Sequence, residues 1–172
     1  MRPIELKIKG INSYREEQVI NFSQLTSQGF FGIFGPTGSG KSTILDAITL
    51  ALYAKLPRGS KNFININESS ASVSFRFSIT TTETKEYLVE RSFRYPGKDR
   101  TSTARNTTAR LSLLSETDID VLADKPTDVT RSCTDLLGLS SDDFLRTVVL
   151  PQGQFSDFLK LNNQERRGML QR

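Results

Sequence analysis

Residues 35–42 read GPTGSGKS, and this octapeptide constrains the fold more than any other stretch of the chain. It matches the pattern G-x-x-x-x-G-K-[ST], in which a glycine-rich loop joins a buried strand to a helix. The apolar run FFGIF, from Phe30 to Phe34, precedes the glycines, and the segment TILDAITLALYA follows them. The pattern therefore predicts a short buried strand, the loop, and a helix from about Lys41 to about Ala54.

The residue types of this loop suit the binding of nucleotide phosphates. Glycines allow backbone conformations that side chains forbid, so successive N–H groups can converge on phosphate oxygens at a helix N-terminus. Lys41 is expected to reach the β- and γ-phosphates, and the Ser42 hydroxyl is expected to ligate Mg²⁺. The predicted phosphate-binding residues are Gly35, Pro36, Thr37, Gly38, Ser39, Gly40, Lys41, Ser42 and Thr43. The alternative is a glycine-rich turn that only links a strand to a helix.

Composition excludes several other kinds of chemistry. The chain has 172 residues and no histidine, and Cys133 is its single cysteine. Histidine-based triads, cysteine zinc clusters and internal disulfides are therefore excluded, and one cysteine fits a reducing cytosol. Neither a signal-peptide pattern nor an apolar run of membrane-spanning length occurs, so we expect a cytoplasmic protein. The net charge of +4 permits a polyanionic partner without requiring one.

Alternating apolar and polar residues predict strands at 3–9 and 18–22, which we expect to pair in antiparallel fashion. The second of these strands should place Val19 and either Ile20 or Phe22 inward. The helix after the glycine loop should face a sheet with Ile44, Leu45, Ile48, Leu52 and Tyr53. Residues 57–71 are polar and predict a long loop.

The second half of the chain begins with a strand-rich region. Strands are predicted at 72–79, 86–95, 110–115 and 119–123, and the polar tract 97–110 is expected to be a mobile, exposed connection.

Helices are predicted to follow these strands. Pro126 to Leu137 should form a helix ended by Gly138, and Ser140 with Asp143 predicts a capped start for the next helix. Asn162 and Glu165 have the spacing of a further helix start. Together these elements predict an α/β fold.

Residues 148–159, VVLPQGQFSDFL, contain a second group of candidate site residues. Gln152 and Gln154 flank a glycine in a break between helical patterns, where a neutral amide can reach Mg²⁺ or an attacking water. The alternative is an ordinary polar loop. The guanine-reading pattern N-K-x-D does not occur downstream, which argues against a GTPase.

Three segments, KGINSYREEQVINF, GPTGSGKSTILDAITLALY and TVVLPQGQFSDFLK, together resemble the N-terminal half of the ATPase head of the SbcC family. These bacterial proteins are long coiled-coil ATPases of double-strand-break repair. The resemblance implies an ATP-binding-cassette lobe over residues 1–160, with an antiparallel β-subdomain, and the start of a coiled-coil helix at 161–172. It implies that ATP and Mg²⁺ are the cofactors, that Asn12, Ser13 and Asn65 lie beside the nucleotide, and that Gln152 is the Q-loop glutamine. Lys41 and Gln152 would then serve catalysis, with Ser42 and Gln152 on the metal; Gln154 is the less favoured glutamine.

The resemblance also implies partners. In such proteins two heads sandwich ATP, and their pairing gates access of double-stranded DNA to a metal-dependent nuclease of the SbcD type. The signature motif, the Walker B Asp-Glu pair and the switch histidine of the C-terminal lobe do not occur here. We therefore expect a fragment or one half of a split protein, which binds ATP without hydrolysing it and works in the bacterial cytoplasm near the nucleoid.

Two other classes of protein use the same kind of ATPase domain. The second interpretation is an SMC-type cohesion or condensation ATPase without a nuclease, and the third is the motor domain of a transporter. A further hypothesis is a DNA-contacting patch formed by clustered basic residues. Its members would be Arg91, Arg94, Lys98, Arg100, Arg105 and Arg110. The alternative is a solvated hairpin, because clustering in sequence does not establish clustering in space.

Overall fold

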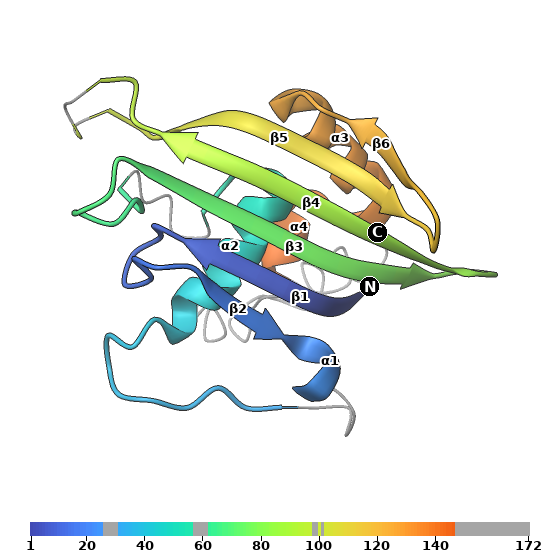
Figure 1. The fold of residues 1–172 in the computed structure, drawn as a ribbon, viewed down its shortest axis with the longest axis horizontal. Coiled ribbons are helices and arrows are strands. Elements are labelled where there is room, and N and C mark those ends of the chain that lie inside the picture. The colour runs from blue at the N-terminus through green and yellow to red at the C-terminus, as the bar shows by residue number, and fades with distance from the viewer. Residues whose placement is uncertain (26–30, 57–61, 98–99, 101, 147–172) are drawn as a thin grey trace, which may run out of the picture.

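The computed structural model of the chain describes residues 1–25, 31–56, 62–97, 100 and 102–146. Within these residues the strands form a six-stranded sheet in the order β2-β1-β3-β4-β5-β6, with every neighbouring pair antiparallel (Figure 1). The strands are β1 Arg2–Lys9, β2 Gln18–Asn21, β3 Ser70–Thr80, β4 Thr84–Arg94, β5 Arg105–Leu114 and β6 Ile119–Ala123. The helices are α1 Phe22–Leu25, α2 Lys41–Tyr53, α3 Pro126–Leu137 and α4 Ser141–Phe144.

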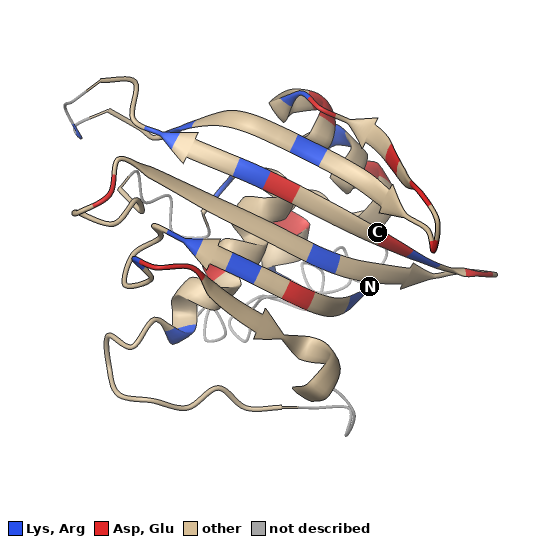
Figure 2. Ribbon diagram, in the orientation of Figure 1, with Lys and Arg blue, Asp and Glu red and all other residues tan. Residues whose placement is uncertain are grey.

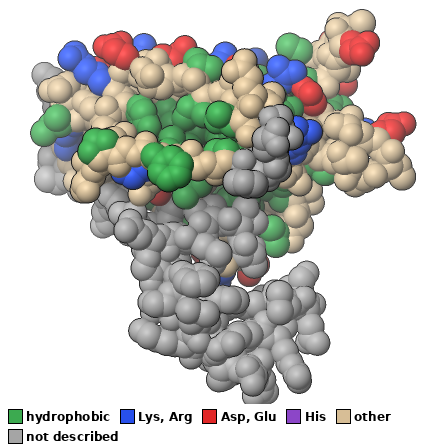
Figure 3. Space-filling view, turned by 90° about the horizontal axis from the view of Figure 1, so that it is seen from below, with side chains coloured by type: hydrophobic (Ala, Val, Ile, Leu, Met, Phe, Trp, Pro, Cys, Tyr) green, Lys and Arg blue, Asp and Glu red, His purple; other side chains and the backbone are tan. Residues whose placement is uncertain are grey.

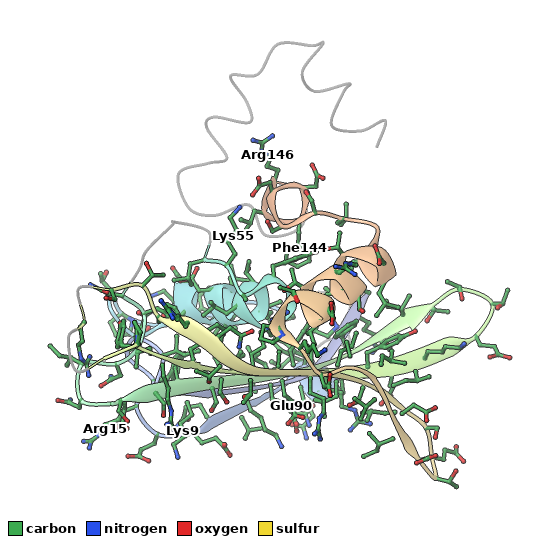
Figure 4. The ribbon with its side chains drawn as sticks, turned by 90° about the horizontal axis from the view of Figure 1, so that it is seen from above. Lys9, Arg15, Lys55, Glu90, Phe144 and Arg146 are labelled. Carbon is green, nitrogen blue, oxygen red and sulfur yellow. The ribbon has the colours of Figure 1, made fainter. Side chains whose placement is uncertain are left out.

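Helices α2 and α3 cover one face of the sheet and α4 lies on their outer side, whereas Lys9 and Glu90 lie on the opposite face (Figure 4). Strand residues alternate between these faces, as period-two patterning requires. On β3 the inward residues Val73, Phe75 and Phe77 are buried. The core therefore lies between the sheet and the helices, and it fixes where α2 and the glycine loop before it can sit.

Helix α2 confirms the predicted helix after the glycines, with one change to its inward face. Ile44, Leu52 and Tyr53 are buried as expected, but Leu45 is 38% exposed. Ala47 and Leu50 are buried as well. Leu45 lies on nearly the same side of the helix as Leu52, seven residues later, but residues 49–53 are buried on every side whereas the outer side of the first turns of α2 is exposed.

The strand predicted for Phe30 to Phe34 is wrong in its described part. Residues 31–36 have no regular secondary structure, and Phe34 is 93% exposed. A strand needs a neighbour to accept its backbone hydrogen bonds, and none of the described strands runs beside this segment.

The inward face of β2 also differs from the prediction. Val19 is 54% exposed, whereas Phe22, just after the strand, is buried. Ile20 packs against the core. Because successive strand residues face opposite sides, Ile20 and Val19 cannot both point inward, and pairing of Leu6 with Ile20 selects Ile20.

The polar tract 97–110 is not wholly a loop, because β5 begins at Arg105. Residues 105–110 pair with β4, and Ala109 is buried opposite Arg91. Pairing with a well-packed neighbour makes this stretch a strand although its own side chains lack apolar periodicity. The remaining predicted strands are confirmed within a few residues of their expected ends.

The predicted span of α3 and the predicted start of α4 are confirmed. Gly138 ends α3 with a left-handed φ of 65°, and its N–H bonds to the Thr134 carbonyl. Ser140 caps α4 by accepting a 3.2 Å hydrogen bond from the Asp143 N–H. The candidate segments at 148–159 and 162–165 lie outside the described residues. Across the described part of the chain, no helix is both long enough and apolar enough to cross a membrane.

Cys133 of α3 leads to a prediction about pH. Its thiol is fully buried, and burial raises its pKa from 9.0 to about 11. Above pH 9 the unfolded thiol ionises while the folded thiol keeps its proton, so the free energy of unfolding should fall as pH rises from 9 to 11. We expect a loss of about 2 kcal/mol, measured by urea denaturation. Cys133→Ala removes the titrating group, so its stability should fall less over the same window; parallel curves for the two proteins would refute the effect.

Candidate nucleotide-binding site

The glycine loop ends where α2 begins. Gly38 and Gly40 have φ of 86° and 89°, a region that other residues adopt at a cost. At Gly40 a Cβ would also lie 2.6 Å from the Ser13 hydroxyl oxygen, so the loop packs closely against a neighbouring turn. The first N–H groups of a helix lack partners within it, so α2 presents donors and a positive dipole end to this loop.

Lys41 lies across the loop. Its ammonium donates to the carbonyl oxygens of Gly35 at 2.8 Å and Pro36 at 2.7 Å, and the Ser39 hydroxyl oxygen is 3.5 Å away. The positive charge is thus concentrated on the inner side of the loop. An anion that reaches the helix N-terminus would meet both the ammonium and the backbone donors.

The turn between β1 and β2 forms the second wall of the site. Ile11 and Tyr14 exchange two backbone hydrogen bonds, of 3.0 and 2.8 Å, and Asn12 takes a left-handed φ of 48°, which asparagine tolerates better than most residues. The Asn12 amide donates to the Thr43 hydroxyl at 3.3 Å, and the Tyr14 hydroxyl donates to the Gly40 carbonyl at 3.4 Å. This turn therefore holds the loop and the start of α2 from the sheet side.

Turn and loop enclose a cavity of about 450 Å³. It is lined by Asn12, Ser13, Thr37, Gly38, Gly40, Lys41, Ser42 and Thr43. Two segments that are distant in sequence are thus brought together as walls of one site. Of the other predicted residues, Gly35, Pro36 and Ser39 contact the Lys41 ammonium.

Asn65 takes a supporting position behind the turn. Its amide donates to the Asn12 carbonyl at 2.6 Å, and its backbone N–H bonds to the Gly10 carbonyl at 2.8 Å. Arg100 in turn donates to the carbonyls of Asn65 at 3.0 Å and Glu68 at 2.6 Å. Contacts through Asn65 thus stabilise the left-handed turn that faces Thr43.

Sequence reasoning missed Tyr14 and the supporting role of Arg100. Burial raises the pKa of Tyr14 above its ordinary value of 10.0, so its hydroxyl stays protonated at neutral pH and donates to Gly40. Its position directly after Asn12 and Ser13 was the available signal. Gln152 and Gln154 lie outside the described residues.

The predicted basic patch is wrong for Arg91. This residue is 2% exposed, because strand alternation places it on the inward face of β4 with Val89 and Phe93. Of the others, Arg94, Arg105 and Arg110 are exposed, Arg100 is half-buried, and Lys98 lies outside the described residues. Arg110 stands opposite Glu90, and acidic and basic residues are interspersed over the sheet (Figure 2). A DNA-contacting role for the exposed arginines stays a prediction.

The donor set fits Mg²⁺ held mainly by phosphate. The described residues contain no group of three His, Cys, Asp or Glu side chains that could hold a metal ion. Mg²⁺ commonly takes few protein ligands, with substrate phosphates and water completing its shell. Ser42 lines the cavity beside Lys41, and a hydroxyl is a ligand type that fits such a site.

A glycine loop at a helix N-terminus, a lysine across it and a hydroxyl at the next position define a P-loop nucleotide-binding site. Comparison with known families gives the more particular assignment. The family model described as an AAA domain (AAA_23) matches residues 5–172, and the chain belongs to this family of P-loop ATPases.

Individual relatives agree with the family. The chain is 53% identical over 172 residues to the SbcC component of the SbcCD nuclease of Clostridium acetobutylicum, and 51% identical over 176 residues to its counterpart from Bacillus subtilis. Each match covers 100% of this chain and 15% of the relative. A "Probable DNA double-strand break repair Rad50 ATPase" of Aquifex aeolicus is 33% identical over 172 residues, which is 97% of this chain and 16% of that protein. The resemblance to the N-terminal ATPase region of SbcC is confirmed, and the chain spans about 15% of the length of these two SbcC proteins.

Proposed function

We propose that the chain is the ATP-binding half of an SbcC-type ATPase in a nuclease complex that processes DNA double-strand breaks and hairpins. The observation that carries this proposal is the P-loop cavity between the β1–β2 turn and α2, in a chain 53% identical to the SbcC component of an SbcCD nuclease. Relatives named for a nuclease or for a break-repair ATPase favour this proposal over the SMC-type alternative.

The roles follow from the site. Lys41 and the loop N–H groups would bind the β- and γ-phosphates of ATP, and Ser42 would ligate Mg²⁺, whose charge neutralises the phosphates when bound. Asn12 and Ser13 would border the nucleotide, with Asn65 behind them. Gln152 would complete the metal site as the Q-loop glutamine, with Gln154 as the alternative.

A second lobe is the first partner that we propose. The described segment after residue 30 leaves Phe31, Ile33 and Phe34 exposed, and Leu45 of α2 and Leu25 of α1 are exposed as well. Hydrophobic side chains gather on the face seen from below (Figure 3). Exposed apolar surface of this kind marks an interaction site, and the C-terminal lobe of an ATP-binding-cassette head fits it. Residues 1–160 would then be the first lobe, and 161–172 the start of a coiled-coil helix.

The remaining partners belong to the assembled head. Two heads would pair around ATP, and this pairing would control the access of double-stranded DNA to an SbcD-type nuclease in the cytoplasm, near the nucleoid. Retention of a metal-dependent phosphoesterase in a pull-down with the assembled head supports this function. A head that pairs with ATP and binds DNA but retains no nuclease would support the SMC-type alternative.

The test of this function is ATP binding without turnover. Walker B and signature residues do not occur in the sequence, so the 172-residue chain should bind Mg·ATP and show phosphate release no faster than the buffer background. Phosphate release should appear only when the complementary lobe is added.

Calorimetry measures the binding, and a coupled phosphate assay measures the turnover. Turnover by the chain alone that disappears in Lys41→Ala would contradict the proposal of an incomplete head. Absence of ATP binding in the folded chain would contradict the proposed function altogether.

A further inference from the structure

Arg91 occupies an unusual place for an arginine. It lies on β4 between Val89 and Phe93, on the face that packs against the helices, and it is 2% exposed. Arginine is among the residues least often buried, and the removal of its charge from water costs free energy unless every N–H group has a partner. The hydrogen bonds of Arg91 therefore indicate why an arginine is buried at this position.

Two of these contacts hold the end of α2. The Arg91 Nε donates to the Ala51 carbonyl at 2.6 Å, and Nη2 donates to the Leu52 carbonyl at 3.1 Å. Carbonyls in the last turn of a helix have no partner within the helix and carry the negative end of its dipole. Arg91 thus supplies hydrogen bonds and a compensating charge at the C-terminal end of the helix that carries the P-loop lysine at its other end.

Three further contacts hold β5 and α3. Nη1 donates to the Asn106 side-chain oxygen at 2.8 Å and to the Pro126 carbonyl at 3.2 Å, and Nη2 donates to the Thr130 hydroxyl at 3.0 Å. With the two bonds to α2, all five N–H donors of the guanidinium are used. One side chain therefore joins the end of α2, strand β5 and the start of α3.

The acceptors are themselves fixed in place. A bulge between Ser92 and Phe93 turns Asn106 toward Arg91, and the Asn106 amide donates to the Ser92 and Thr108 carbonyls at 2.9 and 2.7 Å. The Thr130 hydroxyl donates to the Pro126 carbonyl at 2.9 Å. None of the acceptors that Arg91 contacts in these bonds is a carboxylate.

Burial lowers the pKa of Arg91 to about 10, so the group is cationic at neutral pH and its charge faces helix carbonyls.

We propose that Arg91 is a positioning residue for nucleotide binding, which holds α2 so that its N-terminal end presents the P-loop correctly. Helix α2 has 13 residues and a length of about 20 Å, so a tilt at its C-terminal end moves Lys41 and the loop N–H groups. The N-terminal end is held by weaker contacts at 3.3 and 3.4 Å from Asn12 and Tyr14. This inference rests on the proposed function, because it assigns Arg91 to the same ATP site.

The test separates positioning from general stability. Arg91→Met removes the guanidinium and keeps much of the side-chain volume, whereas Arg91→Lys keeps the charge with fewer donors. Val129→Ala is the matched control, because Val129 is a fully buried α3 residue whose truncation destabilises the same layer without touching α2 carbonyls. Two quantities are measured where every variant is fully folded: amide hydrogen exchange in peptides covering 35–46, and the affinity for Mg·ATP.

For Arg91→Met we expect about tenfold faster exchange in these peptides and about tenfold weaker ATP binding, with Arg91→Lys between it and the wild type. Val129→Ala should stay within about twofold of the wild type in both. Wild-type exchange and affinity in Arg91→Met would overturn the proposal, and so would equal effects in Val129→Ala.

Two milder variants keep the test decisive where Arg91→Met fails to fold. Asn106→Ala and Thr130→Ala each remove one acceptor and should shift both quantities in the same direction by about threefold; values equal to the wild type would overturn the proposal. The two readouts also separate this inference from the proposed function. If the wild-type chain binds no ATP, the proposed function is contradicted. The exchange rates of residues 35–46 in the variants still test whether Arg91 holds α2 and the loop in position.

Discussion

Lys41→Ala should weaken Mg·ATP binding by about 100-fold or more, which places it below detection in a calorimetric titration. The ammonium lies 2.7 to 2.8 Å from the Gly35 and Pro36 carbonyls on the inner side of the loop, where the phosphates would enter. Its side chain is outside the buried core, so the loss should come from the site and leave the fold intact.

Lys55→Ala is the matched control for this change. Lys55 stands just beyond the other end of α2 and forms an exposed ion pair with Asp142. The Lys55→Ala substitution therefore removes the same charge near the same helix but far from the loop. It should bind ATP like the wild type, because exposed ion pairs contribute little. Unchanged affinity in Lys41→Ala, with a normal circular dichroism spectrum, would contradict the P-loop assignment.

Gly40→Ala should have the second large effect, on both stability and binding. Gly40 has a φ of 89°, and an added Cβ would lie 2.6 Å from the Ser13 hydroxyl and 2.8 Å from a Tyr14 ring carbon. We expect a loss of about 1 to 3 kcal/mol in the free energy of unfolding. ATP affinity should fall by about tenfold or more, because the turn that lines the cavity must move. Urea denaturation and calorimetry measure the two effects.

Gly138→Ala separates backbone strain from the site. Gly138 also has a positive φ, of 65°, but a Cβ there meets nothing within 4 Å. This variant should lose about 1 kcal/mol of stability and keep its affinity for ATP. If Gly40→Ala binds ATP as well as Gly138→Ala does, the close packing of the turn against the loop has no role in binding.

Local patterns predicted most of the fold. Period-two alternation predicted the strands, and Pro126 and Gly138 marked the ends of α3. The Ser140 cap could be predicted because its partner, Asp143, stands only three residues away in the sequence. The patterns failed where a neighbour decides the outcome. Phe34 lies in an apolar run but has no adjacent strand in the described structure, and β5 starts at Arg105 because β4 pairs with it.

The site shows the same division. Consecutive residues of the P-loop were predictable, because each contributes through its own backbone or side chain. Tyr14 and Arg91 were not, since their roles depend on carbonyls that only the folded chain brings near: Gly40 for one, Ala51 and Leu52 for the other. Arg91 looked like part of a basic surface because charge is visible in a sequence and hydrogen-bond acceptors at a helix end are not.

The most direct measurement is a structure of this chain bound to its C-terminal counterpart and a non-hydrolysable ATP analogue. We predict that the phosphates fill the cavity between residues 12–13 and 37–43, with the Lys41 ammonium within hydrogen-bond distance of the β- and γ-phosphate oxygens. We also predict Mg²⁺ between the Ser42 hydroxyl and the phosphates, with the Gln152 amide at its edge. A nucleotide bound elsewhere, or phosphates without contact to Lys41, would contradict the central claim that this chain forms a P-loop ATP site.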